Sequence, residues 1–546
     1  MKKIPYGISD YEKLITNDYY YVDKTMYLEK LEDIGDTLIY LRPRRFGKTL
    51  FTSMMYYYYD INSIDKFDTL FKDTYVYNNP TKDKNNYYIL KFDFSGMNSA
   101  ETIEEIKEKF NMCVKQSIIS FMKYYNLELN IDFNIDASDL LKSFLVNVEL
   151  DNKIYIIIDE YDNFTNSILS SNTNIFKKIL GTNGFVKDFY ARIKEYRGTI
   201  IDRVFITGVC SISLDSMTSG FNVGINITND YRFNAMTALT HDEVKTLIKD
   251  LDNKEEIFNE MLEYYDGYKF NRIGENVFNP TLTMYFVKNI IETGEKPEVM
   301  LDSNIISNYE QIRNIISLGN YKEIIDDIYD NGEVDSILTV NFDLNKQFKR
   351  EDIVSLLYYF GYLTIKRTGY IGTVFTIPNN VIKEVFNNYF MEILEKEKVE
   401  INNNEANMGL IEMAETGRID KITEVISSIL KQDSFRDFIN ITENVIKQMY
   451  LTLLNRNNAF DMISEMEVKN GYVDIYFRNK NNLSIYNIMI ELKYLKKTEE
   501  SQYNQKYNEA LEQINKYIED DRINKINLKK YIVIFTGSDY KITEIE

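Results

Sequence analysis

An α/β fold in two separate parts is predicted by three features of the sequence. Residues 37–50 have the pattern of a strand, a tight basic loop and a helix. Residues 153–163 form a β-branched run that ends in two carboxylates, as expected of a strand buried on both faces of a parallel sheet. From residue 443 onward, a helix, a strand hairpin, a second helix and a further strand follow in order. The first two features predict a parallel sheet with covering helices, and the third predicts a smaller α/β domain.

Length and composition limit the class of protein. A chain of 546 residues is long enough for roughly two to four domains, and its 44% hydrophobic and 14% aromatic residues can fill their cores. The formal net charge of −20 argues against a diffuse attraction to nucleic acid or to anionic membranes, so any site for a polyanion must be local. With two cysteines, a polar N-terminal segment and no apolar run near the ~18 residues of a membrane span, we expect a cytoplasmic protein without a disulfide framework.

The elements around the first sheet follow in order along the chain. Two short helices joined by a Tyr-rich extended piece are predicted between Ile4 and Glu32, and Asp23 is the expected N-cap of the second helix. After the basic loop, we expect a helix from Lys48, an alternating strand at residues 85–95 and a long amphipathic helix at residues 101–125.

The basic loop has the chemistry of a phosphate site. It ends in Gly47-Lys48-Thr49 at the start of a helix, where backbone N–H groups can cradle oxyanions, a lysine can reach the outer phosphates and a threonine hydroxyl can ligate Mg²⁺. Arg44 and Arg45 can add positive charge. The usual P-loop pattern has a second glycine five residues before Gly47, and this chain has Arg42 there. The match is therefore incomplete, and we expect slow ATP hydrolysis because glycine normally permits the geometry of this loop.

The carboxylates that end the strand at residues 153–163 are a partner for that loop. A carboxylate at the carboxyl end of a parallel strand lies in the crevice where open α/β sheets bind ligands. We therefore expect Asp159 to hold Mg²⁺, directly or through water, and Glu160 to polarise the attacking water of ATP hydrolysis. The alternative is a buried strand with a capping acid pair, which would make both halves of the site coincidences. The sequence thus predicts a P-loop NTPase core with ATP and Mg²⁺ as cofactors.

Two further polar residues need an interpretation. A third strand is predicted at residues 203–209, and Thr207 near its end is placed to sense the γ-phosphate, as polar residues there do in ATPases with additional strands. The single histidine, His241, lies in the first turn of a helix that begins with a capping box from Thr240 to Glu243. A surface position is expected for His241.

Six segments carry a resemblance to a known family. They are YYYVDKT (19–25), RPRRFGKTL (42–50), IIIDEYD (156–162), FITGV followed by SLDSMTSGFN (205–222), YYDGYKFN (264–271) and NPTLT (279–283). In this order they resemble the AAA-ATPase-like family that is often fused to a PD-(D/E)XK nuclease. The usual loop of that family is RPRRFGK followed by Ser or Thr, which implies that Arg42 is a family trait. The resemblance covers roughly the first 300 residues.

The middle of the chain is predicted to form a lid. Residues 350–379 have the pattern of a helix ending near Gly361 and two strands joined by a turn with glycine and basic residues, which resembles a winged helix. Arg367 at the turn can touch nucleic acid, but such modules in ATPases more often pack as a lid, and we favour the lid. The polar segment 395–407 is the expected linker. We predict an AAA-ATPase-like P-loop domain at 1–235, a helical and winged-helix lid at 236–400, and a third domain at 408–546.

The third domain carries a second cluster of functional side chains. Asp474 falls in the middle of one strand, and Glu491 and Lys493 share a face of the next because alternate residues of a strand point the same way. Charges buried on adjacent strands are costly unless they bind something. Asp474 and Glu491 can share a hard divalent cation such as Mg²⁺, and Lys493 can position or activate a water for attack on a phosphodiester.

This order of residues and elements resembles the PD-(D/E)XK nuclease fold, with Val473 in place of the proline. The resemblance implies that Glu443 on the preceding helix and Gln513 on the following one support the metal or the phosphate, and Glu465 competes with Glu443 for that role. An inactive nuclease fold kept as a binding module is the alternative.

Six lysines provide the local basic track that a polyanion would need, and a solvated face is the alternative: Lys493, Lys496, Lys497, Lys525, Lys529 and Lys530. The function that we expect is ATP-regulated cleavage of DNA, in which nucleotide state controls access to the nuclease or its assembly. The alternative is a signalling-type ATPase switch in which ATP gates formation of a homo-oligomer and the C-terminal domain only binds nucleic acid or a protein.

Overall fold

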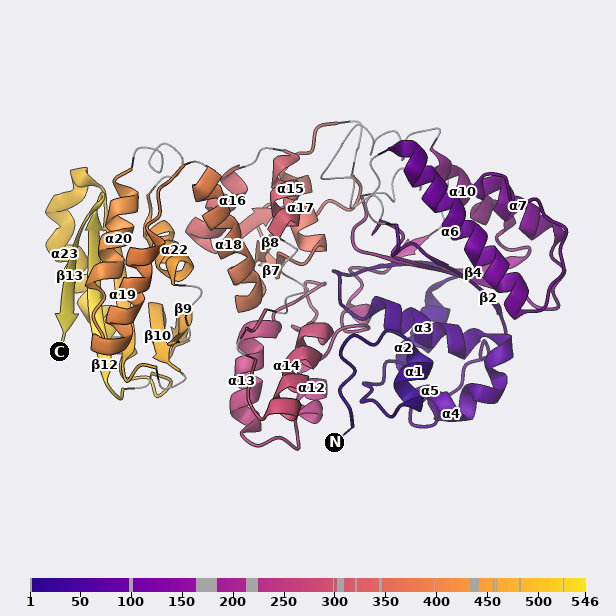
Figure 1. The fold of residues 1–546 in the computed structure, drawn as a ribbon, viewed down its shortest axis with the longest axis horizontal. Helices are drawn as coiled ribbons and strands as arrows, with labels where there is room; N and C mark the ends of the chain where they lie inside the picture. Colours follow the sequence, from indigo (N-terminus) through magenta and orange to yellow (C-terminus); the bar gives the residue numbers. More distant parts are fainter. Residues whose placement is uncertain are drawn as a thin grey trace. The chain divides into compact units, whose positions relative to one another are not determined.

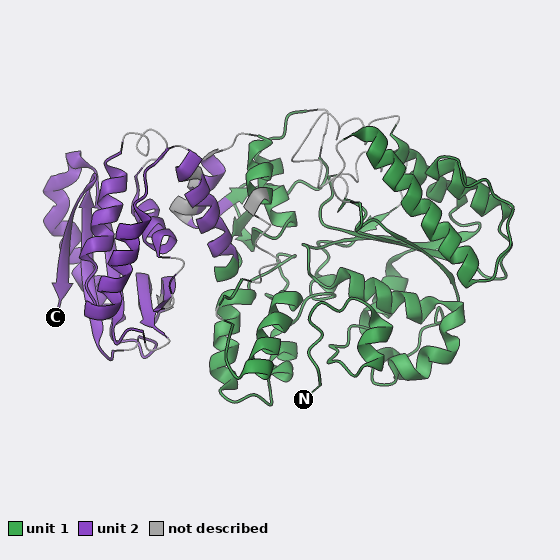
Figure 2. Cartoon of the chain, viewed as in Figure 1, with its two compact units in different colours: residues 1–321, 335–381 green, residues 322–334, 382–546 purple. Residues whose placement is uncertain are grey.

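The computed structural model describes residues 2–97, 102–163, 184–212, 224–297, 299–301, 309–319, 322–342, 346–396, 398–432, 441–454, 457, 459–480, 483–523 and 525–546. The chain forms two compact units, which Figure 2 shows in different colours. Unit 1 comprises residues 1–321 and 335–381, and unit 2 comprises residues 322–334 and 382–546.

A sheet of five parallel strands is the centre of unit 1, in the order β2-β3-β4-β1-β5. The strands are β1 (Thr37–Leu41), β2 (Tyr88–Asp93), β3 (Ile154–Asp159), β4 (Ile201–Gly208) and β5 (Ile225–Asn226). Every residue of β1 and β3 is buried, which is why their sequences are unbroken apolar runs. Because all five strands run the same way, the segments that follow β1, β3 and β4 meet at one edge. The predicted parallel sheet is confirmed.

Helices cover both faces of this sheet. Figure 1 shows α1 to α5 on one face and α6, α7 and α10 on the other. Their bounds are α1 Tyr11–Thr16, α2 Met26–Ile34, α3 Lys48–Tyr59, α4 Phe67–Phe71, α5 Tyr75–Asn78, α6 Ile103–Tyr124, α7 Ala137–Asn147 and α10 Phe185–Tyr196, with a short 3-10 helix at Ile61–Lys66. Leu38 and Tyr40 of β1 pack in one core with Met54 and Tyr58 of α3, so the sheet fixes the direction in which α3 leaves the loop.

The rest of unit 1 is mainly helical and includes a small hairpin. Its helices are α12 His241–Leu247, α13 Lys254–Tyr265, α14 Pro280–Thr293, α15 Tyr309–Ser317 and α17 Arg350–Tyr359, with a 3-10 turn at Tyr231–Phe233. β7 (Thr364–Thr368) and β8 (Thr373–Thr376) form an antiparallel pair, and β6 (Glu333–Ser336) lies beside β8. The helix and two strands expected at residues 350–379 are present, and their interpretation as a winged-helix lid stays a prediction. No helix in the described parts of the chain has the length and apolar character that crossing a membrane requires.

Unit 2 is built on a mixed sheet in the order β13-β12-β11-β10-β9, in which β11 and β12 are parallel and the other pairs antiparallel. The strands are β9 Phe460–Val468, β10 Gly471–Asn479, β11 Asn487–Leu495, β12 Leu528–Thr536 and β13 Asp539–Ile545. The helices are α16 Lys322–Asn331, α18 Asn380–Lys396, α19 Asn403–Thr416, α20 Asp420–Leu430, α22 Glu443–Leu453 and α23 Tyr503–Tyr517, with a 3-10 helix at Lys497–Gln502. One core joins α19, α20 and α22 to the sheet, and a second core joins α23 to it. The sheet is therefore covered on both faces.

The predicted cap of the second helix is wrong. Thr25, not Asp23, is the N-cap of α2. The Asp23 carboxylate accepts hydrogen bonds from the backbone N–H groups of Thr25 at 2.8 Å and of Tyr75 at 2.6 Å. Asp23 therefore ties the segment before α2 to the start of α5.

Unit 2 also contains elements that the sequence pattern did not predict. Strands β9 and β13 extend the sheet at both edges, so the hairpin and the later strand are its interior. The division between the units falls after Val381, ahead of the linker expected at residues 395–407, and α19 occupies the end of that segment. The three-domain division at 1–235, 236–400 and 408–546 stays a prediction.

Candidate functional site

The loop between β1 and α3 has the geometry of an anion site. Gly47 is the N-cap of α3 and has a φ of 74°, a conformation that favours glycine, and a Cβ at this position would lie 3.1 Å from the Thr237 carbonyl oxygen. No side chain caps the start of α3. The first N–H groups of this helix therefore need a partner from outside it, which a phosphate can supply.

Lys48 is the first residue of α3 and is only 4% exposed. Its ammonium donates to the carbonyl oxygens of Arg42 and Pro43, each at 3.0 Å. Burial lowers the pKa of Lys48, and the charges of Glu160 and Asp159 oppose this shift. A phosphate would offer this buried ammonium an anionic partner, and hydrogen bonds to an anion are stronger than hydrogen bonds to neutral carbonyls.

The arginines of the loop are placed differently from one another. Arg44 is exposed, and its guanidinium donates to the Asn163 side chain at 3.3 Å beyond the end of β3. Arg45 has a positive φ of 66°, and its carbonyl accepts a hydrogen bond from the Thr281 hydroxyl at 2.8 Å. The Arg42 side chain is buried and its guanidinium donates to backbone carbonyls, so it is not a phosphate ligand.

Asp159 ends β3 and is 1% exposed. Its carboxylate accepts hydrogen bonds from the hydroxyls of Thr207 at 2.5 Å and Thr52 at 3.3 Å. The structure thus brings the predicted Asp159 and Thr207 together from β3 and β4. Thr52 was not predicted, although its spacing of three residues from Thr49 places the two on one side of α3. The single proton of the Thr52 hydroxyl is shared between Asp159 and the Thr49 carbonyl at 3.0 Å, and the role of Thr49 as a Mg²⁺ ligand stays a prediction.

Glu160 follows β3 in a left-handed backbone conformation with a φ of 52°. Its N–H donates to the Thr207 hydroxyl at 3.4 Å. Burial raises the pKa of Glu160, while the nearby Lys48 charge lowers it. A carboxylate with a raised pKa is a better proton acceptor, and strained backbone of this kind is found at functional sites. Residues 213–223, which include all of SLDSMTSGFN after β4, lie outside the described residues.

The second candidate site lies in unit 2, on β10 and β11. Asp474 of β10 accepts a hydrogen bond from the Leu492 N–H at 2.9 Å, which holds its carboxylate against β11. The Lys493 ammonium lies 2.8 Å from Glu491 Oε1, 4.0 Å from Asp474 Oδ2 and 3.9 Å from Glu443 Oε1. Three predicted carboxylates from α22, β10 and β11 are therefore gathered around the ammonium of a fourth predicted residue, Lys493.

Glu491 is the most deeply buried member of this cluster, at 1% exposed. Its Oε2 is buried and has no hydrogen-bond partner among the described residues. Burial raises the pKa of Glu491 to about 8, and the neighbouring Asp474 charge adds to the effect. Burial also lowers the pKa of Lys493, but the charges of Glu491, Glu443 and Asp474 outweigh it and leave that pKa raised. The site therefore holds three carboxylates close to one cationic side chain, that of Lys493.

Two supporting residues were expected near this cluster. Glu443 is the first residue of α22, and burial raises its pKa. Gln513 on α23 donates to the Tyr517 hydroxyl at 3.2 Å, and the pKa of Tyr517 is raised by burial and then by the Glu491 charge. The role of Gln513 in supporting the metal or the phosphate stays a prediction. The side chain of Glu465, the competitor of Glu443, is not among those described.

The donor set fits a divalent cation by its chemistry. Carboxylate oxygens are hard ligands, and the unpartnered Glu491 Oε2 beside Asp474 is an oxygen that a cation would satisfy. In the described parts of the chain, however, no group of three or more His, Cys, Asp or Glu side chains is already arranged to hold a metal ion. The ion pair between Lys493 and Glu491 occupies the cluster instead.

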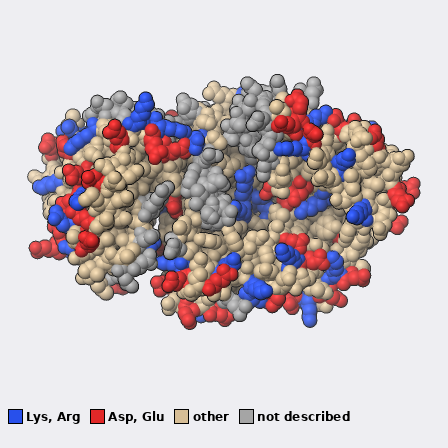
Figure 3. All heavy atoms as spheres, in the orientation of Figure 1, with Lys and Arg blue, Asp and Glu red and all other residues tan. Residues whose placement is uncertain are grey.

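The proposed basic track is interrupted by acids. Lys497 lies 3.8 Å from Asp539, Lys529 lies 2.5 Å from Glu544, and Lys530 donates to the backbone carbonyl of Glu546. Figure 3 shows acidic and basic side chains intermixed on the face that it presents. These pairings favour the alternative of a solvated face.

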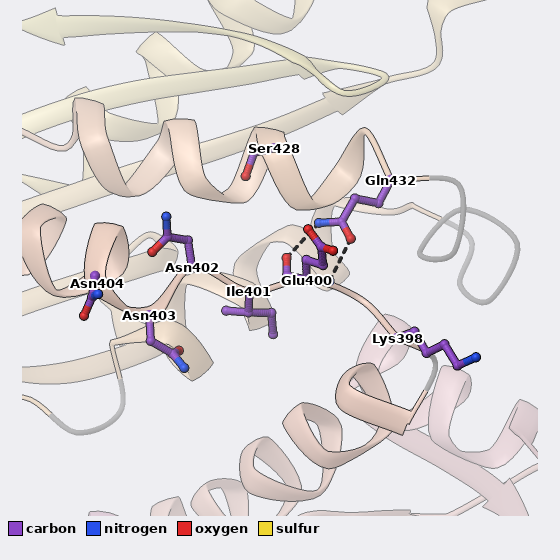
Figure 4. Close-up of a pocket in the computed structure, with 8 residues that line it drawn as sticks. All are labelled: Lys398, Glu400, Ile401, Asn402, Asn403, Asn404, Ser428 and Gln432. Carbon is purple, nitrogen blue, oxygen red and sulfur yellow. Dashed lines mark hydrogen bonds between the residues drawn. The ribbon is translucent and has the colours of Figure 1, made fainter.

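A polar pocket of about 840 Å³ in unit 2 contains none of the predicted site residues. Figure 4 shows its lining, which comprises Lys398, Glu400, Ile401, Asn402, Asn403, Asn404, Ser428 and Gln432. The Gln432 amide accepts a hydrogen bond from the Glu400 N–H at 2.8 Å and donates to the Glu400 carbonyl at 2.7 Å. This amide fastens the segment before α19 to the end of α20, which is a structural role.

Comparison with known families places the two candidate sites in matches to two different families. Residues 5–218 match a family described as predicted AAA-ATPase, and residues 441–545 match the PD-(D/E)XK nuclease superfamily. The chain joins an AAA-ATPase-like domain to a PD-(D/E)XK nuclease superfamily domain. The ATPase-like match contains the loop at Lys48 and the carboxylates after β3, and the nuclease match contains the cluster around Lys493. The predicted family and fold class are confirmed.

The proteins compared below share little sequence identity with this chain. One curated protein, named "Uncharacterized protein in vnfD 5'region" from Azotobacter chroococcum mcd 1, is 26% identical over 289 residues, 51% of this chain and 50% of that protein. The chain thus matches about half the length of this curated relative. Among solved structures, a Walker-type ATPase of Pyrococcus abyssi has a TM-score of 0.33 with 11% identity, over 71% of this chain and 98% of its own. Cdc6p from Pyrobaculum aerophilum has a TM-score of 0.27 with 11% identity, over 70% and 98%.

Proposed function

We propose that the AAA-ATPase-like domain binds and hydrolyses ATP at the edge of its sheet. The N–H groups at the start of α3 and the Lys48 ammonium bind the phosphates, and Arg44 and Arg45 add positive charge. Thr49 and Asp159 hold Mg²⁺, which supplies charge neutralisation for the transferred phosphoryl group. Glu160 accepts a proton from the attacking water, for which its raised pKa is suited.

We propose that the nuclease domain cleaves DNA phosphodiester bonds with a divalent metal. Asp474 and Glu491 hold the metal, which polarises the phosphodiester when bound. Lys493 orients the attacking water and neutralises charge on the phosphate, and Glu443 and Gln513 support these groups from α22 and α23. Nucleotide state in the ATPase-like domain regulates this cleavage.

One observation carries the nuclease proposal. Glu491 Oε2 is a buried carboxylate oxygen without a hydrogen-bond partner among the described residues, in a cluster with Asp474 and Lys493. A carboxylate left this way destabilises the fold, because burying an unsatisfied polar group is costly. A bound cation is the partner that removes this cost.

A second function is favoured by the ion pair between Lys493 and Glu491 at 2.8 Å. This pair already neutralises the deepest carboxylate, so the cluster can persist without metal. In that case the protein is an ATP-dependent switch, and the nuclease fold binds nucleic acid or a protein without cutting.

Cleavage by the purified full chain separates the two functions. Plasmid, linear and single-stranded DNA, and RNA, are incubated with and without Mg²⁺ or Mn²⁺ and ATP, and fragments are resolved by electrophoresis. The nuclease proposal predicts metal-dependent fragments that Asp474→Asn abolishes. Asp461→Asn is the matched control, because Asp461 is a buried carboxylate of the same sheet that pairs with Lys480 at 3.2 Å outside the cluster. If metal yields no fragments from any substrate while the chain still binds ATP, the switch is the function.

A further inference from the structure

Arg42 occupies the position where P-loops usually have glycine, and its side chain is 1% exposed. Its guanidinium donates to three backbone carbonyls: Leu41 at 2.8 Å, Thr228 at 2.8 Å and Phe233 at 2.9 Å. Two of these acceptors lie almost two hundred residues further along the chain. An arginine in this position stays charged, so its burial is tolerable only because these acceptors are fixed around it.

Two aromatic rings complete the surroundings of the guanidinium. Its central carbon lies 4.4 Å from the ring centre of Tyr40 and 4.0 Å from that of Phe270. Such cation–π contacts strengthen when they are shielded from water. Phe270 belongs to segment 264–271, so the side chain of Arg42 links the phosphate loop to that segment.

A second contact of the loop reaches the same segment. Phe46, which is 1% exposed, packs edge to face on Tyr268 at 4.9 Å and on Phe270 at 5.3 Å between ring centres. Pro43 lies so close to Gly361 that a Cβ on the glycine would be 2.9 Å from the proline ring. Both ends of the loop are therefore held by parts of unit 1 that follow the sheet.

The backbone of Arg42 contacts the residue that would bind phosphate. Its carbonyl oxygen accepts a hydrogen bond from the Lys48 ammonium at 3.0 Å. Thr228, Phe233 and Phe270 hold the Arg42 guanidinium in place. Because the side chain of Arg42 is held, we infer that its backbone carbonyl keeps the direction in which it faces Lys48. A glycine at position 42 would remove the three hydrogen bonds that the guanidinium donates and leave the space between two rings empty.

From these contacts we propose that Arg42 is a positioning residue for ATP. It holds the loop in the shape that presents Lys48 and the start of α3, and it couples ATP binding to segment 264–271. This inference rests on the proposed ATP site. It predicts that replacing Arg42 with glycine, which restores the usual P-loop pattern, weakens ATP binding.

Calorimetric titration of the full chain with ATP and Mg²⁺ tests this proposal. Arg42→Gly is expected to raise the Kd for ATP by roughly tenfold or more, the effect of losing hydrogen bonds from a charged group. Arg42→Lys keeps the charge and the apolar stem but lacks the three-carbonyl fork, and it is expected to raise Kd for ATP at a temperature well below its own melting temperature, where the variant is folded. Arg418→Gly, which removes an exposed guanidinium paired with Asp420 in unit 2, is the matched control with unchanged Kd.

A coupling measurement excludes a purely structural role. Arg42→Met and Phe270→Leu, alone and combined, are compared for ATP affinity and for melting temperature without ATP. Coupling predicts that their effects on Kd are not additive, whereas a structural role predicts lower melting temperatures with unchanged Kd.

The outcomes separate this inference from the ATP site itself. If the parent chain does not bind ATP, the proposed ATP site fails and the inference fails with it. If the parent binds ATP and the folded Arg42→Gly or Arg42→Lys chain binds it equally well, only the inference is overturned. If Arg42→Gly does not fold, Arg42→Lys decides the question.

Discussion

The Thr207 hydroxyl donates a 2.5 Å hydrogen bond to the Asp159 carboxylate and accepts one from the Glu160 N–H at 3.4 Å. One threonine on β4 therefore holds both carboxylate residues at the end of β3. Thr207 orients these acids whether or not it also senses the γ-phosphate.

Thr207→Val tests this orienting role, because valine keeps the shape and removes the hydroxyl. ATP hydrolysis is expected to slow by roughly tenfold, since a hydrogen bond to a charged group contributes about 1.5–3 kcal/mol. Thr207→Ser keeps the hydroxyl and should retain most of the rate. Equal phosphate release by the valine variant and the parent would remove Thr207 from the mechanism.

Lys48→Ala should abolish ATP binding, because it removes the ammonium that the loop holds beside the start of α3. Calorimetry measures the affinity directly. Lys194→Ala, at an exposed position of α10, is the control and should bind ATP normally. Unchanged affinity in Lys48→Ala would show that the phosphates bind elsewhere.

Glu160→Gln should separate binding from turnover. The amide keeps the size of the side chain but cannot accept the proton of the attacking water, so ATP binding is retained and hydrolysis falls by roughly 100-fold to 10,000-fold. Steady-state phosphate release and calorimetry on the same preparation measure the two effects. A fully active variant would exclude Glu160 as the base.

The nuclease cluster should be independent of the ATP site. Asp474→Ala, Glu491→Ala and Lys493→Ala are each expected to eliminate DNA cleavage and to leave ATP hydrolysis largely intact, because the two sites share no residue.

Mg²⁺ or Mn²⁺ should raise the melting temperature of the parent chain, since two close carboxylates repel until a cation lies between them. Asp474→Ala and Glu491→Ala should show no increase in melting temperature with metal, and Lys493→Ala should show most of the increase of the parent chain. Cleavage by Glu491→Ala at the parent rate would contradict the assignment.

Stability without metal should depend on pH through Glu491. Its pKa is raised from 4.5 to about 8 in the folded chain, so the folded state binds this proton more tightly than the unfolded state. The stability from the protonated form is fully present below pH 4.5 and is lost as pH rises through about 8. With a chelator present, the parent melting temperature should therefore fall more steeply over this window than that of Glu491→Gln, which cannot ionise. Parallel curves for the two proteins would show that Glu491 is not perturbed.

The parallel sheet and its edge were predictable because burial on both faces requires unbroken apolar strands. The run that contains β3 and the acids that end it are adjacent in the sequence, so Asp159 and Glu160 could be placed by position alone. Asp474, Glu491 and Lys493 could be grouped because strand alternation fixes which residues share a face.

Other features depend on contacts between distant parts of the chain. The partners of Arg42 at Thr228, Phe233 and Phe270 are invisible to a local pattern, which shows only an arginine where glycine is usual. The Asp23 carboxylate accepts hydrogen bonds from Tyr75 in α5 and from its neighbour Thr25. The contact with Tyr75 depends on tertiary packing and cannot be predicted from the local sequence. Strand β13 has four polar residues among its seven and lies at an edge of its sheet.

The left-handed backbone of Glu160 lowers thermal stability at a residue that the proposed ATP hydrolysis needs. Asparagine or glycine adopts a φ near 52° at lower cost than glutamate, so either one at position 160 is expected to raise the melting temperature. Either one would also delete the proposed base. Directed evolution scored only on heat resistance would therefore enrich inactive ATPases at this position, and a useful selection must include turnover.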